Sequence, residues 1–311
     1  MNRDSLLLLS CDWGTSSFRL RLVERRSRRV LAEHTSPEGA KTIAAAHRPG
    51  PGRRSAFAAV LQRGLQTLNV STRSKIPLVV SGMACSTIGW WPLPYASVPV
   101  QLDGTNFVSV DRIIQGRTVR FISGLRAACD VMRGEECELV GLFQNPGRLA
   151  LANDCCVVLP GTHSKHVRLH RGRIIGFSTH PTGELFALLS RHSTLCEKLA
   201  SGFTTTAFRA GVHAARQLGL GPALFRTRAR SVLGLMRPAH AADFLSGVLI
   251  GSEIASLPKR SRVILAAGPN LARRYRLAVG IIHPKATVTV IPAAESAHAV
   301  VRGHVHLAGD L

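Results

Sequence analysis

The chain has 311 residues, of which 45% are hydrophobic, and its formal net charge is +22. A chain of this length can bury a large core and is long enough for two domains. All of its apolar runs are shorter than the roughly 18–20 residues of a membrane span, and the run at the start is too short for a signal peptide. We therefore expect a cytoplasmic globular protein with no membrane-spanning segment.

The distribution of charged residues indicates the kind of partner, and the cysteines indicate the redox state of the thiols. The basic residues are scattered rather than grouped in blocks, and only two tyrosines are present to stack on bases. This pattern favours an anionic small-molecule partner over nucleic acid. The seven cysteines are odd in number and have no C-x-x-C spacing, so we expect reduced thiols that lie mostly in the core.

In the first half of the chain, short apolar runs predict strands, and apolar residues spaced three and four apart predict helices. The expected strands are 6–10, 18–23, 30–34, 77–81 and 119–122, and the expected helices are 56–68 and 130–143. A Pro-Gly pair at 146–147 then interrupts the pattern, which places a domain boundary near 145–153.

An acid, a glycine and two hydroxyl residues follow the first expected strand: Asp12, Gly14, Thr15 and Ser16. Small residues let backbone amides approach phosphate oxygens closely, and the hydroxyls add donors. Asp12 can hold Mg²⁺ through the waters of the ion. The same residues are also typical of a β-hairpin with an Asx-type turn, so on this segment alone both interpretations stay open.

The strand at 77–81 leads into Ser81, Gly82 and Met83, and a loop rich in Trp and Pro follows. Such a loop, which contains Trp90, can wall a small-molecule pocket. Adjacent tryptophans are equally typical of structural plugs in a core, and the sequence does not decide between the two roles.

Asp130 stands at the start of the helix expected over 130–143. It is suited to cap that helix and also to act as a general base that accepts a hydroxyl proton during phosphoryl transfer. Arg133, one turn further on, is either a clamp for a substrate carboxylate or a solvated surface arginine. Glu136 falls near the apolar face and must find a partner if it is buried.

In the second half the pattern of three strands followed by alternating helices and strands begins again. The expected strands are 155–159, 166–170, 173–178, 263–267 and 287–291, and the expected helices are 183–190, 205–218, 222–235, 241–255, about 271–278 and one from 293. The repetition predicts two related α/β domains, 1–148 and 149–311, that meet at a cleft.

Gly161, Thr162 and Ser164 occupy the place in the second half that the first glycine-hydroxyl segment occupies in the first. Two such loops, one in each domain, could hold a triphosphate from both sides. Gly268 follows a later strand and precedes a helix, where it could cover an adenine, although a plain strand–helix turn has the same sequence.

Taken together, the motifs resemble those of the 2-dehydro-3-deoxygalactonokinases. The segments that carry the resemblance are 12–15, 81–83, 130–136, 159–165 and 182–189. The resemblance implies two ribonuclease-H-like domains of the actin/hexokinase type around a central nucleotide cleft. It also implies that the chain uses ATP and Mg²⁺ to phosphorylate the 6-hydroxyl of 2-dehydro-3-deoxy-D-galactonate in galactonate or galactose catabolism.

The resemblance also assigns roles to single residues. It implies Asp130 as the base and Asp12 as the residue beside Mg²⁺. The phosphate-binding residues would be Gly14, Thr15, Ser16, Gly161, Thr162 and Ser164, and the adenosine turn would contain Gly268. From the motifs themselves we expect the substrate to contact Ser81, Gly82, Met83, Trp90 and Arg133.

The sequence departs from the family pattern at a few positions. Thr87 and Ile88 replace polar residues that usually precede the Gly-Trp pair, His180-Pro181 stands where Met is common, and Ala267 stands where a second glycine is frequent. These departures keep two alternatives open: a kinase for another sugar or keto-deoxy sugar acid, and a non-catalytic protein of the same fold that binds a sugar acid.

Overall fold

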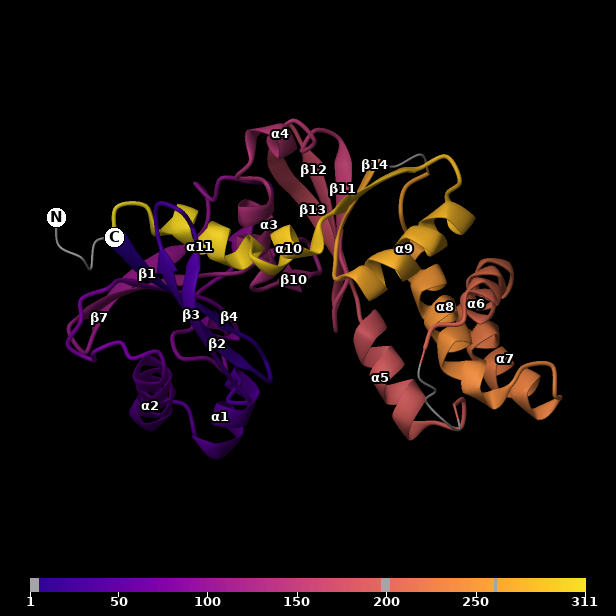
Figure 1. Ribbon diagram of the computed structural model, residues 1–311, viewed down its shortest axis with the longest axis horizontal. Helices are drawn as coiled ribbons and strands as arrows, with labels where there is room; N and C mark the ends of the chain where they lie inside the picture. The colour runs from indigo at the N-terminus through magenta and orange to yellow at the C-terminus, as the bar shows by residue number, and fades with distance from the viewer. Residues whose placement is uncertain (1–5, 197–201, 260–261) are drawn as a thin grey trace. The chain divides into compact units, whose positions relative to one another are not determined.

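The structure, a computed structural model, describes residues 6–196, 202–259 and 262–311 (Figure 1). Its contacts divide the chain into two compact units. The first unit comprises Met1–Asn153, Arg171–Gly176 and Ala297–Leu311, and the second comprises Asp154–His170 and Phe177–Ser296.

The first unit is built on a six-stranded sheet. Its strands are β1 (Leu7–Trp13), β2 (Phe18–Glu24), β3 (Val30–Ser36), β4 (Leu78–Gly82), β7 (Ser109–Ile114) and β8 (Arg117–Ile122). They lie in the order β3-β2-β1-β4-β8-β7. The first three strands form an antiparallel meander, β4 runs parallel to β1, β8 runs parallel to β4, and β7 pairs antiparallel with β8.

The second unit repeats this arrangement. Its strands are β11 (Cys155–Leu159), β12 (Ser164–His170), β13 (Arg173–His180), β14 (Arg262–Ala266) and β15 (Thr287–Ile291). They lie in the order β15-β14-β11-β12-β13, with β12 antiparallel and β14 parallel to β11. The start of β13, which belongs to the first unit, pairs with β6 (Val100–Gln101). The shared strand order confirms the α/β class and the internal repetition expected from the sequence.

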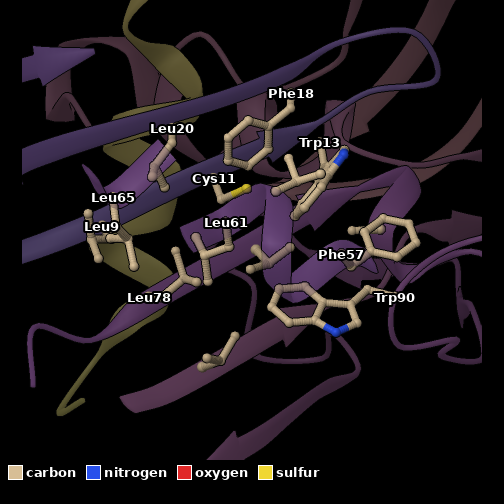
Figure 2. Close-up of a cluster of buried hydrophobic side chains, with 14 of the residues drawn as sticks. Leu9, Cys11, Trp13, Phe18, Leu20, Phe57, Leu61, Leu65, Leu78 and Trp90 are labelled. Atoms are coloured by element: carbon tan, nitrogen blue, oxygen red, sulfur yellow. The ribbon is translucent and has the colours of Figure 1, made fainter. Parts of the chain in front are cut away.

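Alternating side chains explain why the first sheet forms. Leu9, Cys11 and Trp13 point to one face of β1 and are buried there. The next strand adds Phe18 to the same cluster, and Figure 2 shows these side chains in one cluster with Phe57. Helix α2 (Pro51–Thr67) buries the apolar stripe that its helical spacing predicted. The core therefore fixes the strand that carries Asp12.

Several helices and short strands complete the first unit. The helices are α1 (Ala40–Ala46), α2, α3 (Glu135–Leu142), α4 (Pro146–Leu149) and α11 (Ala299–Ala308), and the short elements are η2 (Met83–Cys85), β5 (Ala96–Ser97), β9 (Leu125–Arg126) and β10 (Val131–Met132). Helix α11 packs against α3. A Cβ added to Gly141 would lie 1.7 Å from the carbonyl oxygen of Ala299, so only glycine permits this crossing.

The helical layer of the second unit is larger. It contains α5 (Thr182–His192), α6 (Thr205–Leu218), α7 (Leu220–Val232), η3 (Pro238–His240), α8 (Ala241–Ile254), α9 (Pro269–Ile282) and α10 (Ala293–Ala297). Helices α6 and α8 cross closely, because Gly211 and Gly247 each face a backbone carbonyl of the other helix. Helix α8 is buried on nearly every side, as its almost uniformly apolar sequence predicts.

This arrangement differs from two expectations drawn from the sequence, the grouping of the C-terminal residues and the start of the helix over 130–143. The division at residue 148 stays a prediction, and residues 297–311, which it placed in the second domain, group here with the first unit. The helix expected over 130–143 is wrong in its first five residues. Residues 131–132 pair with β9 instead, and α3 begins only after Gly134, whose φ of 109° is the left-handed region that favours glycine.

All seven cysteines are free thiols, and only Cys129 is exposed. Among the residues that the structure describes, none of the helices combines the length and the apolar character that crossing a membrane requires.

Candidate active site

The first glycine-hydroxyl segment forms the turn between β1 and β2. The Gly14 N–H donates to the Ser17 carbonyl oxygen over 2.8 Å and closes the turn. The start of α1 holds the turn from outside, since amides of that helix donate to the carbonyl oxygens of Gly14 and Thr15. A Cβ on Gly39 would lie 2.3 Å from the Thr15 carbonyl oxygen. The backbone of the turn is therefore fixed while the side chains of Thr15 and Ser16 stay exposed.

The second glycine-hydroxyl segment is built in the same way between β11 and β12. Here helix α5 begins against the turn, and the Glu184 N–H donates to the Thr162 carbonyl oxygen over 3.0 Å. A Cβ on Gly183 would lie 2.4 Å from the Gly161 carbonyl oxygen. In each unit, then, the helix that follows the third strand begins on the glycine-hydroxyl turn, and a glycine allows the close approach. The first unit uses α1 and the second uses α5.

A pocket of about 190 Å³ opens beside the second turn. Four elements line it: the turn itself, α5, α8 and α9. Its wall includes Gly161, Phe186, Leu271 and Arg274, and the Arg274 guanidinium is held by the Asp243 carboxylate at 2.9 Å. The pocket is mostly apolar with a few polar groups, which is typical of a small-molecule site.

Gly268 lies at the beginning of α9, one turn before the pocket residue Leu271. Its φ of −61° is ordinary, and a Cβ there would meet open space. The structure thus places the predicted adenosine turn at the edge of this pocket without requiring a glycine at the position.

Asp12 lies at the end of β1, and its side chain is 30% exposed. Its carboxylate is 3.8 Å from the Arg19 guanidinium. Gly82, paired with Trp13 on the neighbouring strand, has a φ of 83°. A Cβ on Gly82 would lie 2.6 Å from the Trp13 carbonyl oxygen and 3.5 Å from Asp12 Oδ1. Gly82 therefore allows the two strands to approach closely at the Trp13 carbonyl oxygen, next to this carboxylate.

The first turn of α3 adds further acids to the region of Asp12. Burial raises the pKa of Asp12, and Arg19 opposes the shift. Glu135 raises the pKa of Asp12 further. Burial, with a smaller contribution from Glu135 and Asp12, raises the pKa of Glu138 to about 8. No motif in the sequence gave Glu135 or Glu138 a role of its own, although both follow Gly134 at the helix start, where acidic side chains are favoured.

Glu136 is completely buried, as the helical pattern suggested, and the structure supplies its partner. Its Oε2 accepts the Gly134 N–H over 2.7 Å. Burial, reinforced by Glu135, raises the pKa of Glu136 to about 8, so this side chain is mostly neutral at pH 7.

Asp130 is not the cap of a helix, and that interpretation is wrong. The residue lies in the turn between β9 and β10, where its Oδ1 accepts the Val131 N–H over 2.7 Å. Asp130 is half-buried and lines a surface hollow of about 570 Å³, together with Ser97, Arg126 and Cys129. Its assignment as the general base stays a prediction.

Arg133 is not a solvated surface arginine. Its guanidinium donates to the carbonyl oxygens of Cys85 and Leu93, and it lies 4.1 Å from the centre of the Tyr95 ring. These contacts hold both ends of the loop rich in Trp and Pro. Arg133 therefore supports this loop, whatever else its remaining N–H groups bind.

The structure does not bring all of the predicted substrate residues to the surface. Trp90 is 3% exposed, and Figure 2 shows its ring among the core side chains beside Phe57. Ser81 is fully buried, and its hydroxyl is 2.8 Å from His304 Nε2 on α11. Both placements favour a structural role. Met83 is half-buried, and Gly82 adjoins Asp12.

The departures from the family pattern lie in different places. Thr87 is exposed and Ile88 is half-buried, both just after η2 in the first unit. His180 lies in the second unit, where its ring centre is 4.4 Å from that of His166. Among the described residues, no group of three or more His, Cys, Asp or Glu side chains is arranged to hold a metal ion directly.

Comparison with known proteins gives a consistent result. The family model described as 2-keto-3-deoxy-galactonokinase matches residues 12–305. A Rhizobium meliloti protein named as a probable 2-dehydro-3-deoxygalactonokinase is 36% identical over 290 residues, which cover 86% of this chain and 87% of that protein. The Escherichia coli protein named 2-dehydro-3-deoxygalactonokinase is 37% identical over 216 residues, which cover 66% of this chain and 70% of that protein.

A solved structure agrees with the sequence matches. The crystal structure of a Sinorhizobium meliloti protein assigned the name 2-dehydro-3-deoxygalactonokinase superposes with a TM-score of 0.77 at 32% identity. The match covers 98% of this chain and all of that one. The family match spans both glycine-hydroxyl turns, the acids of α3 and the turn before α9. The chain therefore belongs to the 2-keto-3-deoxy-galactonokinase family.

Proposed function

We propose that this protein is a carbohydrate kinase that transfers the γ-phosphoryl group of ATP to the 6-hydroxyl of 2-dehydro-3-deoxy-D-galactonate. The names of its relatives support the substrate. The observation that carries the proposal is the repeated construction of the two glycine-hydroxyl turns, each held by the start of a helix. Fixed turns of small residues present backbone donors to phosphate at little entropic cost.

Each turn offers its own contacts to phosphate. Thr15, Ser16 and Thr162 are exposed and offer side-chain and backbone donors to the β- and γ-phosphates. Ser164 is completely buried, so we assign it to holding the second turn rather than to touching phosphate. The pocket beside the second turn receives the adenosine, with Leu271 and the turn at Gly268 at its edge.

The acids near Asp12 fit a role beside Mg²⁺. Asp12 is partly exposed, and carboxylate oxygens are ligands that Mg²⁺ and its waters prefer. Burial, with a smaller contribution from Glu135, raises the pKa of both Asp12 and Glu138, so a nearby positive charge would favour their ionised forms. A divalent cation held near Asp12 through water would stabilise the ionised carboxylate and offset the charge of the phosphates.

The sugar acid is assigned to the first unit, near Gly82, Met83 and the loop that Arg133 supports. Asp130 is the candidate to accept the hydroxyl proton. Thr87 is exposed in the same unit, so the departures there bear on sugar-acid selectivity. The departure at His180 contacts His166 in the second unit and so belongs with the nucleotide side.

The test is release of ADP from ATP and Mg²⁺ by the purified protein, with and without 2-dehydro-3-deoxy-D-galactonate. We expect release that depends on the sugar acid. If ATP binds but this sugar acid gives no release, a panel of aldonates and other keto-deoxy acids identifies a kinase of different selectivity. If folded protein that binds ATP releases no ADP with any acid of that panel, the result would contradict the kinase proposal and favour a non-catalytic binding protein.

A further inference from the structure

Behind the second glycine-hydroxyl turn lies a buried chain of hydrogen bonds that the phosphate contacts do not explain. The Glu253 side chain on α8 is 1% exposed. Its Oε2 accepts hydrogen bonds from the hydroxyls of Thr182 and Tyr275, the latter over 2.7 Å. Its Oε1 lies 2.9 Å from His166 Nε2. A buried carboxylate is tolerated only when donors satisfy it, and here three side chains do so.

The hydrogen bonds of this chain all run in one direction, from the turn to Glu253. The Tyr275 hydroxyl hydrogen is directed to Glu253, so the Ser164 hydroxyl, 2.9 Å away, donates to the Tyr275 oxygen. The Ser164 oxygen is then free to accept the Gly161 N–H, which lies 3.4 Å away. The sequence of donation therefore runs from the Gly161 backbone through Ser164 and Tyr275 to Glu253. In such chains each bond polarises the next.

The same carboxylate also fixes the second element that holds the turn. Thr182, which donates to Glu253, is the first residue of α5. The following residues of α5 meet the turn, Gly183 through its close approach and Glu184 through its N–H. Glu253 is thus connected to the turn by two routes, one through Tyr275 on α9 and one through the start of α5.

We propose that Glu253 and Tyr275 are positioning residues for the second phosphate turn, and that they set the affinity of the protein for the phosphate groups of the nucleotide. This proposal rests on the proposed function. Neither residue touches the nucleotide phosphates. They determine where the Gly161 backbone lies, and displacements of about 1 Å in a phosphate-binding backbone are enough to weaken binding and transfer.

Tyr275→Phe keeps the ring that lines the pocket and removes the hydroxyl that connects Ser164 to Glu253. We expect the Kd and KM for ATP to rise roughly three- to tenfold, the loss that one buried hydrogen bond implies. The Kd for adenosine, which has no phosphate, stays within about twofold, and the KM for the sugar acid is unchanged. Isothermal titration calorimetry and steady-state kinetics give these values.

Variants at Glu253 separate positioning from general stability. Glu253→Gln keeps a carbonyl oxygen for Thr182 and Tyr275 and offers an N–H₂ group to His166, so it retains ATP affinity close to that of the wild type. Glu253→Ala removes the acceptor and loses at least as much ATP affinity as Tyr275→Phe. Thr227→Val is the matched control, because Thr227 is fully buried in the same helical layer and its hydroxyl makes no hydrogen bond in the described structure.

The ratio of ATP affinity to adenosine affinity decides the outcome. A lowered ratio in Tyr275→Phe and Glu253→Ala, with a wild-type ratio in Thr227→Val and recovery in Glu253→Gln, supports positioning. Equal losses for ATP and adenosine, or a lower melting temperature with both affinities intact, would overturn it and leave a purely structural network. Wild-type protein that binds no ATP would instead overturn the proposed function itself.

Discussion

At the scale of single residues, three acids that lie close together along the chain have different surroundings. Asp130 is half-buried in a turn, Glu138 is half-buried on α3, and Glu136 is fully buried. Burial raises the pKa of the two glutamates to about 8, so in the folded protein they hold protons in a range where a free glutamate is ionised. Because these surroundings differ, we expect substitution of Asp130 to change turnover and substitution of Glu136 to change the pH dependence of stability.

Asp130→Asn tests the general base. The amide keeps the size of the side chain and its oxygen for the Val131 N–H, but it cannot accept a proton. We expect kcat to fall roughly 10²–10⁴-fold, the range for loss of a general base, with the Kd for ATP largely retained. Steady-state kinetics and calorimetry measure the two quantities. Asp111→Asn, at an exposed acid paired with Arg120, is the control. Near-normal turnover of Asp130→Asn would contradict the assignment of Asp130 as the general base.

Glu136→Gln tests the buried acid through stability. The folded pKa of about 8 lies above the unfolded value of about 4.5, so folded protein binds more protons than unfolded protein between these pH values. The free energy of unfolding contributed by this group therefore falls as pH rises from 4.5 to 8. Gln keeps the acceptor for the Gly134 N–H and removes the titration.

The variant should equal the wild type near pH 4.5 and exceed it at pH 8, by up to roughly a few kcal/mol. Urea unfolding at several pH values measures the difference. Parallel stability profiles for the two proteins would show that Glu136 does not titrate in this window.

At the scale of elements, the two units share one arrangement, in which the start of a helix holds a glycine-hydroxyl turn. Strand β1 and its turn were predictable, because the short apolar run and the Gly-hydroxyl segment are local signals. The start of α3 was not. Val131 and Met132 pair with β9, a tertiary contact that no helical spacing records, and only the left-handed φ of Gly134 marks where the helix begins.

Gly183→Ala tests the contact between α5 and the glycine-hydroxyl turn of the second unit. The added Cβ would lie 2.4 Å from the Gly161 carbonyl oxygen, so the turn must move. We expect the KM for ATP to rise at least about tenfold, because a shifted backbone misplaces its phosphate donors. Gly280→Ala on α9 is the matched control. Its Cβ meets open space, and Ala in a helix stabilises by about 0.5–1 kcal/mol.

Steady-state kinetics and thermal unfolding of both glycine variants provide the comparison. Equal KM values for the two variants would contradict the part assigned to the close approach of α5.

At the scale of the whole molecule, the charge of the chain is unevenly distributed. Between residues 202 and 294 the only acids are Asp243 and Glu253, and both are buried. The exposed charges of this stretch are therefore positive, including Arg209, Arg273 and Arg276 along one surface hollow. A surface of one sign attracts anions over distances set by ionic strength.

This distribution predicts a salt effect on catalysis. Both proposed substrates are anions, so kcat/KM for each should fall several-fold as KCl rises from about 20 to 300 mM, which shortens the screening length to below about 10 Å. Sucrose at equal osmolality is the control, since it leaves charges unscreened. A kcat/KM that does not change with KCl would indicate that the positive surface plays no part in substrate capture.

Sequence patterns could not supply the contacts between residues on different elements of the chain. The buried chain from Gly161 to Glu253 joins residues far apart in the sequence, on four different elements. Each of these residues has an ordinary place in its own turn, strand or helix, and their contact depends on how α8 and α9 pack. Trp90 is similar, because its burial depends on contacts with Trp13 and Phe121 rather than on its neighbours in the loop.

The position of α11 bears on how the protein is made. Val301 and Ala308 on this helix cover one face of the first sheet, over Val79 and Ile122. A ribosome delivers those strands some 180 residues before it delivers the helix, and at typical rates of about 5–20 residues per second the interval is roughly ten seconds or longer. During that time the nascent chain carries an uncovered apolar sheet face, which is the kind of surface that chaperones bind. The first unit to be synthesised is thus the last to be completed.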